Sequence, residues 1–511
     1  MNRSLALVFA AATLLYLPTI RYGFVQDDRA IVAANPAVHS LSAAVRGFDA
    51  PYWPPPGEGG LYRPFTILSF AVDWAVSGGR PGWFHFVNVV CHGLVAVLAT
   101  LVVARWLPGS GGGATLAGLM FAVHPVHVEA VAGIVSRAEL LAALGILGAV
   151  LAARRRRWGW VLALSAVAML SKEHGVVVGV VILIDDWLNP DPAGRYPKGL
   201  YAALGALTIA YLGVWYAVGR AGAADVAAPF IGAGALARLR LALPANFRAA
   251  MLLVWPVDLS ADYSPQVIAV PDGFTLAAGA GLGVVLGVVG LGVASRRRAP
   301  ALAFAALAGA MVRLPTSNLI FASGIVLAER DLYLTVLLPA VLAAVGFIWI
   351  RGRWRRSSAI VLAATLVVAL AGRSLLRLPS WTDNRTFLLT LLSDHPESYR
   401  GNQSAAAVFA GMGDTAAALR AYARADSLFS GDPHLKAAYA FYLLGLRHGA
   451  QAAELVDAAR RVAPLEPIAL RCAFLLARQH GDSIGGRAIR DTAVQRYPTE
   501  AVWYAGGHRA P

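Results

Sequence analysis

The sequence predicts an all-α polytopic membrane protein that carries a soluble helical domain in its C-terminal quarter, on three observations. Hydrophobic residues make up 58% of the 511 residues and charged residues only 14%, whereas soluble domains average about 25% charged residues. Apolar runs of membrane-crossing length recur along the first three quarters of the chain. The last quarter is Ala-rich and polar, as expected of a soluble helical segment.

About eleven apolar runs are expected to cross the membrane as helices, and several are shorter than the roughly 20 residues of a full crossing. The runs lie near residues 4–20, 86–106, 114–130, 138–153, 158–171, 175–188, 199–219, 274–294, 299–314, 332–350 and 358–374. We interpret the first as an uncleaved span, because no clear cleavage site precedes Arg21. Segment 238–256 contains Pro244 and Arg248, so we expect it to be re-entrant or surface-lying.

The basic residues predict the orientation. Of the net charge of +15, residues 1–375 carry +12. Their basic clusters between apolar runs are Arg154–Arg157, Arg195 with Lys198, Arg296–Arg298, and Arg351, Arg353, Arg355 and Arg356. Such clusters are typical of cytoplasmic loops and not of a nucleic-acid-binding face. The N-terminus is then cytoplasmic, and the tail is extracytoplasmic unless segment 238–256 crosses fully.

Two domains are expected. Residues 1–375 form the membrane domain, with a long first extracytoplasmic loop at 21–85, and residues 381–511 form a domain of helical repeats. Prolines in the second domain, at positions 396, 433, 467 and 498, are spaced by 37, 34 and 31 residues. The tetratricopeptide repeat (TPR) has a period of about 34 residues with a boundary proline. A generic helical bundle is the alternative.

Polar motifs gather at the ends of apolar runs on the predicted extracytoplasmic side, and Asp27 and Asp28 follow the first run. The other candidates are His124, His127, Glu129, Arg137 and Glu139, then Lys172 and Glu173, then Glu329 and Arg330. Ionisable groups at a membrane edge are costly, so one-sided clustering indicates a functional site. A solvated aspartate pair and internal salt bridges are the alternative interpretations.

A carboxylate pair that faces fixed cations suits group transfer from a lipid-phosphate donor. A carboxylate can remove the proton of an acceptor hydroxyl, and cations stabilise the departing phosphate. His124, His127 and Glu129 could instead ligate a metal ion. Because Pro125 breaks the helix between the two histidines, hydrogen-bonding or packing roles are favoured. Metal dependence stays open.

Six stretches of this sequence resemble the TMTC family of transmembrane and tetratricopeptide-repeat O-mannosyltransferases, within the GT-C glycosyltransferase superfamily. They are Gly23–Asp28, Ala122–Leu141, Ser171–Gly175, Leu252–Ser264, Leu314–Asn318 and Ala328–Leu334. The resemblance implies an inverting membrane enzyme with a polyprenyl-phosphate-linked sugar donor, mannose being expected. It also implies that Asp27 and Asp28 are catalytic.

The same resemblance implies that Arg137, Lys172 and Arg330 bind the donor phosphate. His124, His127, Glu129, Glu139, Glu173 and Glu329 are then supporting polar residues. The Arg-rich composition and the short tail suggest a bacterial homologue in the inner or plasma membrane.

The sequence therefore predicts a glycosyltransferase that acts on a Ser/Thr hydroxyl of a protein or on a glycan, with the tail available to a protein partner. The alternative is a non-catalytic, membrane-anchored TPR scaffold. A transporter ranks below both, because no inverted repeat is evident in the hydropathy.

Overall fold

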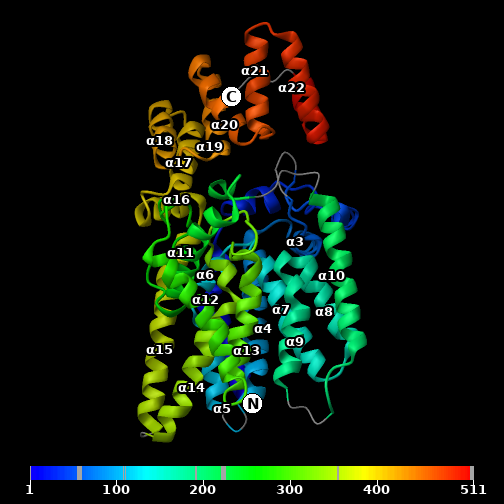
Figure 1. Ribbon diagram of the computed structural model, residues 1–511, viewed down its shortest axis with the longest axis vertical. Helices are drawn as coiled ribbons and strands as arrows, with labels where there is room; N and C mark the ends of the chain where they lie inside the picture. Colours follow the sequence, from blue (N-terminus) through cyan, green and yellow to red (C-terminus); the bar gives the residue numbers. More distant parts are fainter. Residues whose placement is uncertain are drawn as a thin grey trace.

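The structure is a computed structural model that describes residues 2–54, 60–107, 109, 111–189, 193–219, 226–353 and 356–506. Within these ranges the chain is helical and forms no β-strand, which confirms the predicted all-α class. Arg355 of the last basic cluster lies outside the described residues. Figure 1 shows a long helical bundle with the N-terminus at one end and the last helices stacked on the other. We call that other end the tail-proximal end.

Each of the eleven predicted runs contains at least part of one long helix. These helices are α1 (Asn2–Tyr16), α4 (Pro81–Trp106), α5 (Gly111–Val123), α7 (Arg137–Arg154), α8 (Trp158–Ser171), α9 (Val178–Leu188), α10 (Lys198–Gly219), α12 (Leu276–Ser295), α13 (Pro300–Arg313), α14 (Leu337–Arg353) and α15 (Arg356–Arg377). Pro81 and Pro300 occupy the first positions of α4 and α13, where the missing N–H costs no hydrogen bond.

Six of the described helical segments are long and apolar enough to cross a membrane. They are Asn2–Arg21, Pro81–Trp106, Lys198–Val218, Leu276–Ser295, Leu334–Arg353 and Arg356–Trp381. The chain is therefore a multi-pass membrane protein. The shorter apolar helices pack among them, and one apolar core runs through α1, α4, α5, α7, α13 and α14.

The run at 114–130 does not form one helix. α5 ends at Val123, and α6 (His127–Ala132) begins only after Pro125. Proline lacks the N–H that a continuing helix needs and disfavours helical geometry at the residue before it. The break brings the histidines and Glu129 to the tail-proximal end of the bundle.

Segment 238–256 is a continuous helix, α11 (Ala235–Val254), with Pro244 inside it. It is not among the six membrane-length segments, and it packs against α12. Its predicted re-entrant or surface-lying placement stays a prediction.

The first loop packs against the bundle. Its elements are η1 (Leu17–Arg21), η2 (Arg29–Ala33), α2 (Leu41–Arg46), η3 (Gly47–Asp49) and α3 (Pro64–Ser77). Ile31, Phe70 and Phe84 form a buried apolar cluster with Ile134, which follows α6. This cluster packs the first loop against the segment between α6 and α7.

The tail consists of paired helices, α17 with α18, α19 with α20 and α21 with α22. Its elements are η9 (Leu378–Trp381), α16 (Asn384–Asp394), α17 (Tyr399–Gly411), α18 (Thr415–Leu428), α19 (Pro433–Gly445), α20 (Gly449–Val462), α21 (Pro467–Gln479), α22 (Ser483–Arg496), η10 (Pro498–Glu500) and α23 (Ala501–Ala505). Pro433 and Pro467 begin α19 and α21. Assignment to the TPR class and the domain boundaries at 375 and 381 stay predictions.

The crossing of α11 and α12 provides a test of the fold. A Cβ at Gly281 would lie closer than van der Waals contact to the carbonyl oxygen of Leu243, whereas one at Gly279 would meet open space. We expect Gly281→Ala to lower the Tm of the detergent-purified protein. Gly279→Ala should keep or raise the Tm, because alanine favours a helix over glycine by about 1 kcal/mol. Equal Tm values for the two variants in a thermal scan would contradict the close crossing.

Candidate functional site

The two adjacent aspartates have different environments. Asp28 is 1% exposed, and its two carboxylate oxygens accept hydrogen bonds from the backbone N–H groups of Val25 at 3.0 Å and Val135 at 2.9 Å. Burial raises the pKa of Asp28 to about 7, against the opposing effect of these hydrogen bonds. Asp27 is half-buried, and within the described ranges it accepts no hydrogen bond. Asp28 therefore joins two loops, whereas Asp27 is left available.

Arg330 is the cation that lies nearest to the surface in this network. It belongs to η7 (Glu329–Leu332), its side chain is 31% exposed, and it forms an ion pair with Glu129 of α6. Its backbone N–H donates to the same carboxylate at 2.9 Å. Burial lowers the pKa of Arg330, but the carboxylates of Glu129, Asp331 and Asp27 outweigh burial and raise it. Asp27 thus acts electrostatically on a cation that is still partly open.

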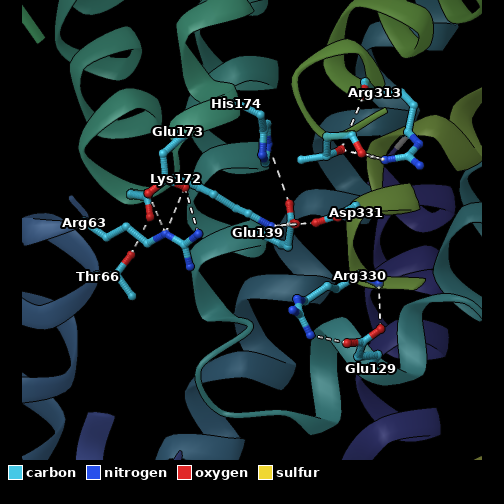
Figure 2. Close-up of polar contacts among 12 residues, drawn as sticks. Arg63, Thr66, Glu129, Glu139, Lys172, Glu173, His174, Arg313, Arg330 and Asp331 are labelled. Carbon is cyan, nitrogen blue, oxygen red and sulfur yellow. Dashed lines mark hydrogen bonds and ion pairs between the residues drawn. The ribbon is translucent and has the colours of Figure 1, made fainter. Parts of the chain in front are cut away.

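Lys172 is buried between two carboxylates (Figure 2). Its ammonium forms ion pairs with Glu139, at the start of α7, and with Asp331, whose Oδ1 lies at 2.9 Å. Burial raises the pKa of Asp331, but Lys172, Arg330 and Arg313 outweigh it and hold that pKa below its usual range. Lys172 therefore joins three helical elements at the tail-proximal end.

His174 faces the same cluster. Its Nε2 lies 3.6 Å from Glu139. Burial, followed by the charge of Lys172, lowers the pKa of His174 to about 3. The imidazole is therefore neutral at physiological pH and acts as a polar neighbour without a charge of its own.

Arg137 is fully buried and fully engaged. Its guanidinium forms an ion pair with Asp73 of α3 at 2.5 Å. It also donates to the side-chain oxygen of Asn88 at 2.7 Å and to the carbonyl of Phe84 at 2.8 Å. The ring of Phe70 lies 4.8 Å from the guanidinium carbon. These contacts tie the first loop to α4 and α7, and its role at a donor phosphate stays a prediction.

Two more predicted acids have specific partners. Glu173 pairs with Arg63, whose Nη2 and Nε lie at 2.8 Å and 3.0 Å from its oxygens. Glu329 accepts hydrogen bonds from the backbone N–H of Ser260 at 2.6 Å and the hydroxyl of Tyr263 at 2.7 Å. The motif at 252–264 is thus brought against η7.

The histidines bind backbone carbonyls. The Nε2 atoms of His124 and His127 lie 3.1 Å from the carbonyl of Leu253 and 3.0 Å from that of Tyr333. A carbonyl oxygen only accepts, so each Nε2 carries the proton and cannot ligate a metal ion. Across the described part of the chain, no group of three or more His, Cys, Asp or Glu side chains is placed to hold a metal.

Four residues of this network were not singled out from the sequence. They are Arg63, Asp73, Arg313 and Asp331. Asp331 follows Arg330 within the stretch 328–334 that resembles the TMTC family, and Arg313 directly precedes the stretch 314–318. Their position in or next to these stretches could have identified them from the sequence. The Nε and Nη2 of Arg313 are buried and have no hydrogen-bond partner in the described structure. Arg63 and Asp73 are found only through contacts made in the folded chain.

Comparison with known proteins confirms the expected resemblance. The chain is 38% identical over 192 residues to Protein O-mannosyl-transferase Tmtc1 of Drosophila melanogaster, covering 35% of this chain and 22% of that protein. It is 29% identical over 436 residues to Protein O-mannosyl-transferase TMTC4 of Mus musculus, covering 71% of this chain and 57% of that protein. It is 36% identical over 188 residues to Protein O-mannosyl-transferase TMTC2 of Homo sapiens, covering 34% and 22%.

The chain thus spans between about a fifth and just over half of the length of these relatives. No protein-family model matches the chain. No solved structure matches it either.

Glu329 predicts a pH dependence of stability. Burial raises the pKa of Glu329 to about 7, above its value of about 4.3 in an unfolded chain. The folded state then binds the proton of Glu329 more tightly than the unfolded state does. The contribution of this group to the free energy of unfolding is therefore fully present below pH ~4.3 and is lost as the pH rises through ~7. Glu329→Gln keeps an oxygen acceptor for Ser260 and Tyr263 but cannot ionise. We expect its Tm to fall less steeply between about pH 5 and pH 8 than that of the wild type.

The matched control for this measurement is Glu454→Gln, since Glu454 is an exposed residue of α20. Its pH profile should follow that of the wild type. If Glu329→Gln did so as well, the buried, protonated state of Glu329 would be contradicted.

Proposed function

We propose, from the premise that this chain is similar to the TMTC O-mannosyl-transferases, that it is an inverting membrane glycosyltransferase. It moves a sugar, which we take to be mannose, from a polyprenyl-phosphate donor to a hydroxyl of a protein Ser/Thr or of a glycan. The observation that carries the proposal is Asp27: a half-buried carboxylate, without a hydrogen bond in the described ranges, that acts electrostatically on the partly open Arg330.

Asp27 is the proposed general base. Its carboxylate accepts the proton of the acceptor hydroxyl while the hydroxyl oxygen forms a bond to the anomeric carbon of the sugar. The bond from that carbon to the phosphate oxygen breaks on the opposite face, which inverts the configuration. Asp28 holds the loop through two backbone hydrogen bonds. Its high pKa means that much of it is protonated near neutral pH.

Arg330 is the proposed ligand of the donor phosphate. The leaving phosphate gains negative charge as the sugar–oxygen bond breaks, and a fixed cation stabilises that charge. Arg330 is partly exposed, whereas Lys172 and Arg137 are buried in ion pairs with carboxylates. We therefore assign Lys172 and Arg137 to holding the segments that carry Asp27 and Arg330.

Placement in the cell is part of the same proposal. The tail-proximal end would face the extracytoplasmic side, which in a bacterial cell is the periplasm or the exterior. The protein or glycan acceptor and any protein partner would then approach beside the tail. The alternative is a non-catalytic scaffold. It would not require a half-buried carboxylate without a hydrogen bond near a membrane edge, where ionisable groups cost free energy.

The base assignment is tested with Asp27→Asn. In proteoliposomes supplied with polyprenyl-phosphate mannose and a Ser/Thr peptide, we expect transfer to fall roughly 10²- to 10⁴-fold, as for loss of a general base. Asp49→Asn, on an exposed aspartate of the same loop, is the control and should keep full transfer. Mass spectrometry of the peptide gives the readout, and full activity of Asp27→Asn would remove Asp27 as the base.

The phosphate assignment is tested with Arg330→Gln. We expect the KM for the donor to rise about tenfold and kcat to fall, because a charge-assisted contact to phosphate is lost. Arg330→Lys should recover part of the loss, since it keeps the charge but not the planar fork.

Arg330→Gln also leaves Glu129 without its cation. The double variant Glu129→Gln/Arg330→Gln removes both charges, so that no unpaired carboxylate is left to destabilise the fold. It therefore separates an effect on folding from an effect on donor binding. If the folded double variant bound the donor as the wild type does, Arg330 would not be the phosphate ligand. Arg46→Gln, on an exposed arginine of the first loop, controls for the loss of net charge.

A further inference from the structure

We propose that Asn384, the first residue of α16 in the tail, is a positioning residue for Asp27, so that the base of the tail forms part of the active site. This inference rests on the proposed function, because it takes Asp27 as the base. It goes further by giving the tail a role in the reaction that does not depend on binding a partner.

Two backbone N–H groups of the loop before Asp27 donate to the tail. The N–H of Gly23 donates to the carbonyl oxygen of Thr382 at 3.0 Å. The N–H of Gln26 donates to the side-chain oxygen of Asn384 at 2.6 Å. Gln26 directly precedes Asp27, so the Asn384 contact acts one peptide unit away from the reacting carboxylate.

The backbone at Gln26 needs such a partner. The φ angle of Gln26 is 51°, in the left-handed region. Residues other than glycine adopt this region rarely, and it costs them free energy. A conformation of this kind persists only where surrounding contacts determine it. Asp28, which follows Asp27, fixes the backbone conformation on the other side, because its carboxylate accepts hydrogen bonds from the backbone N–H groups of Val25 and Val135. Asp27 therefore lies between two attachments, one of which comes from the tail.

Asn384 is itself held in place. It follows Asp383, whose side chain caps α16 by accepting from the backbone N–H of Thr386 at 2.8 Å. Replacing the Asn384 side chain leaves this cap intact. The helix should therefore survive, and only the contact with Gln26 should be lost.

The tail is also docked on the membrane domain at points farther along the chain. The hydroxyl of Ser398 donates to the carboxylate of Asp262 at 2.7 Å. The side-chain amide of Gln266 donates to the carbonyl of Leu428 at 3.0 Å. Gln266 also has a left-handed backbone, with φ of 80°. The tail therefore contacts the membrane domain at three separated points, and these contacts support the position of Asn384.

The oxygen atom of Asn384 is the group that matters, which gives a sharp pair of variants. Asn384→Leu removes the acceptor at similar size, whereas Asn384→Asp keeps an oxygen for the N–H of Gln26. In the full-length protein in proteoliposomes, we expect Asn384→Leu to lower kcat roughly 10- to 100-fold, as a misplaced catalytic group does. The KM for polyprenyl-phosphate mannose should stay within about twofold, because Arg330 is not moved. Asn384→Asp should keep most of kcat.

The control is Arg385→Ala, which changes the neighbouring exposed residue of α16 and should leave both constants unchanged. The Tm of each variant is measured alongside. A merely structural role for Asn384 would lower the Tm and leave kcat per folded molecule unchanged. Such a Tm effect alone would overturn the proposal. It would also be overturned if Asn384→Leu had the kcat of the wild type, or if Asn384→Asp lost as much kcat as Asn384→Leu.

Failure of this inference and failure of the proposed function give different results. If Asp27→Asn is inactive while Asn384→Leu is fully active, the base assignment stands and the positioning role is wrong. If Asp27→Asn keeps full activity, Asp27 is not the base, and the positioning role is overturned together with it.

Discussion

The ion pairs of Lys172 and Arg330 with the carboxylates of α6, α7 and η7 hold the tail-proximal end of the protein together. A charge removed from water must be paired, and removing one partner of a buried pair costs about 3–5 kcal/mol. Helices that are far apart in the sequence are thereby held at defined positions. The position of Arg330 depends on this network, because Arg330 forms an ion pair with Glu129 and lies next to Asp331, a partner of Lys172.

The two adjacent aspartates differ in their surroundings. Asp28 is buried and serves as an acceptor for two backbone N–H groups. Asp27 accepts no hydrogen bond within the described ranges and is half-buried. Buried carboxylates therefore hold the segments of the chain together, and the half-buried Asp27 is the carboxylate that we propose as the general base. The tail contacts the same loop through Asn384, whose side-chain oxygen accepts a hydrogen bond from the backbone N–H of Gln26.

The sequence predicted the helices well, because membrane-length apolar runs leave few other structures and Pro125 marks the break between α5 and α6. It also predicted that separate polar motifs lie together, and the ion pairs of Glu139 with Lys172 and of Glu129 with Arg330 join four of these residues. It could not predict that Arg137 pairs with Asp73 or that Asn384 reaches Gln26, since such contacts join residues far apart in the chain. The change of composition near residue 381 predicts a domain boundary. It could not predict the contacts between the tail and the membrane domain, because a few hydrogen bonds leave no mark on composition.

The most direct test of the account is a cryo-electron microscopy map of the protein in lipid nanodiscs with a non-hydrolysable phosphonate analogue of polyprenyl-phosphate mannose. We expect the phosphonate to lie within hydrogen-bonding distance of the guanidinium of Arg330. The anomeric carbon should lie on the side facing Asp27, with room for one hydroxyl between them. A phosphonate bound away from Arg330, with the sugar out of reach of Asp27, would show that these two residues do not form the active site.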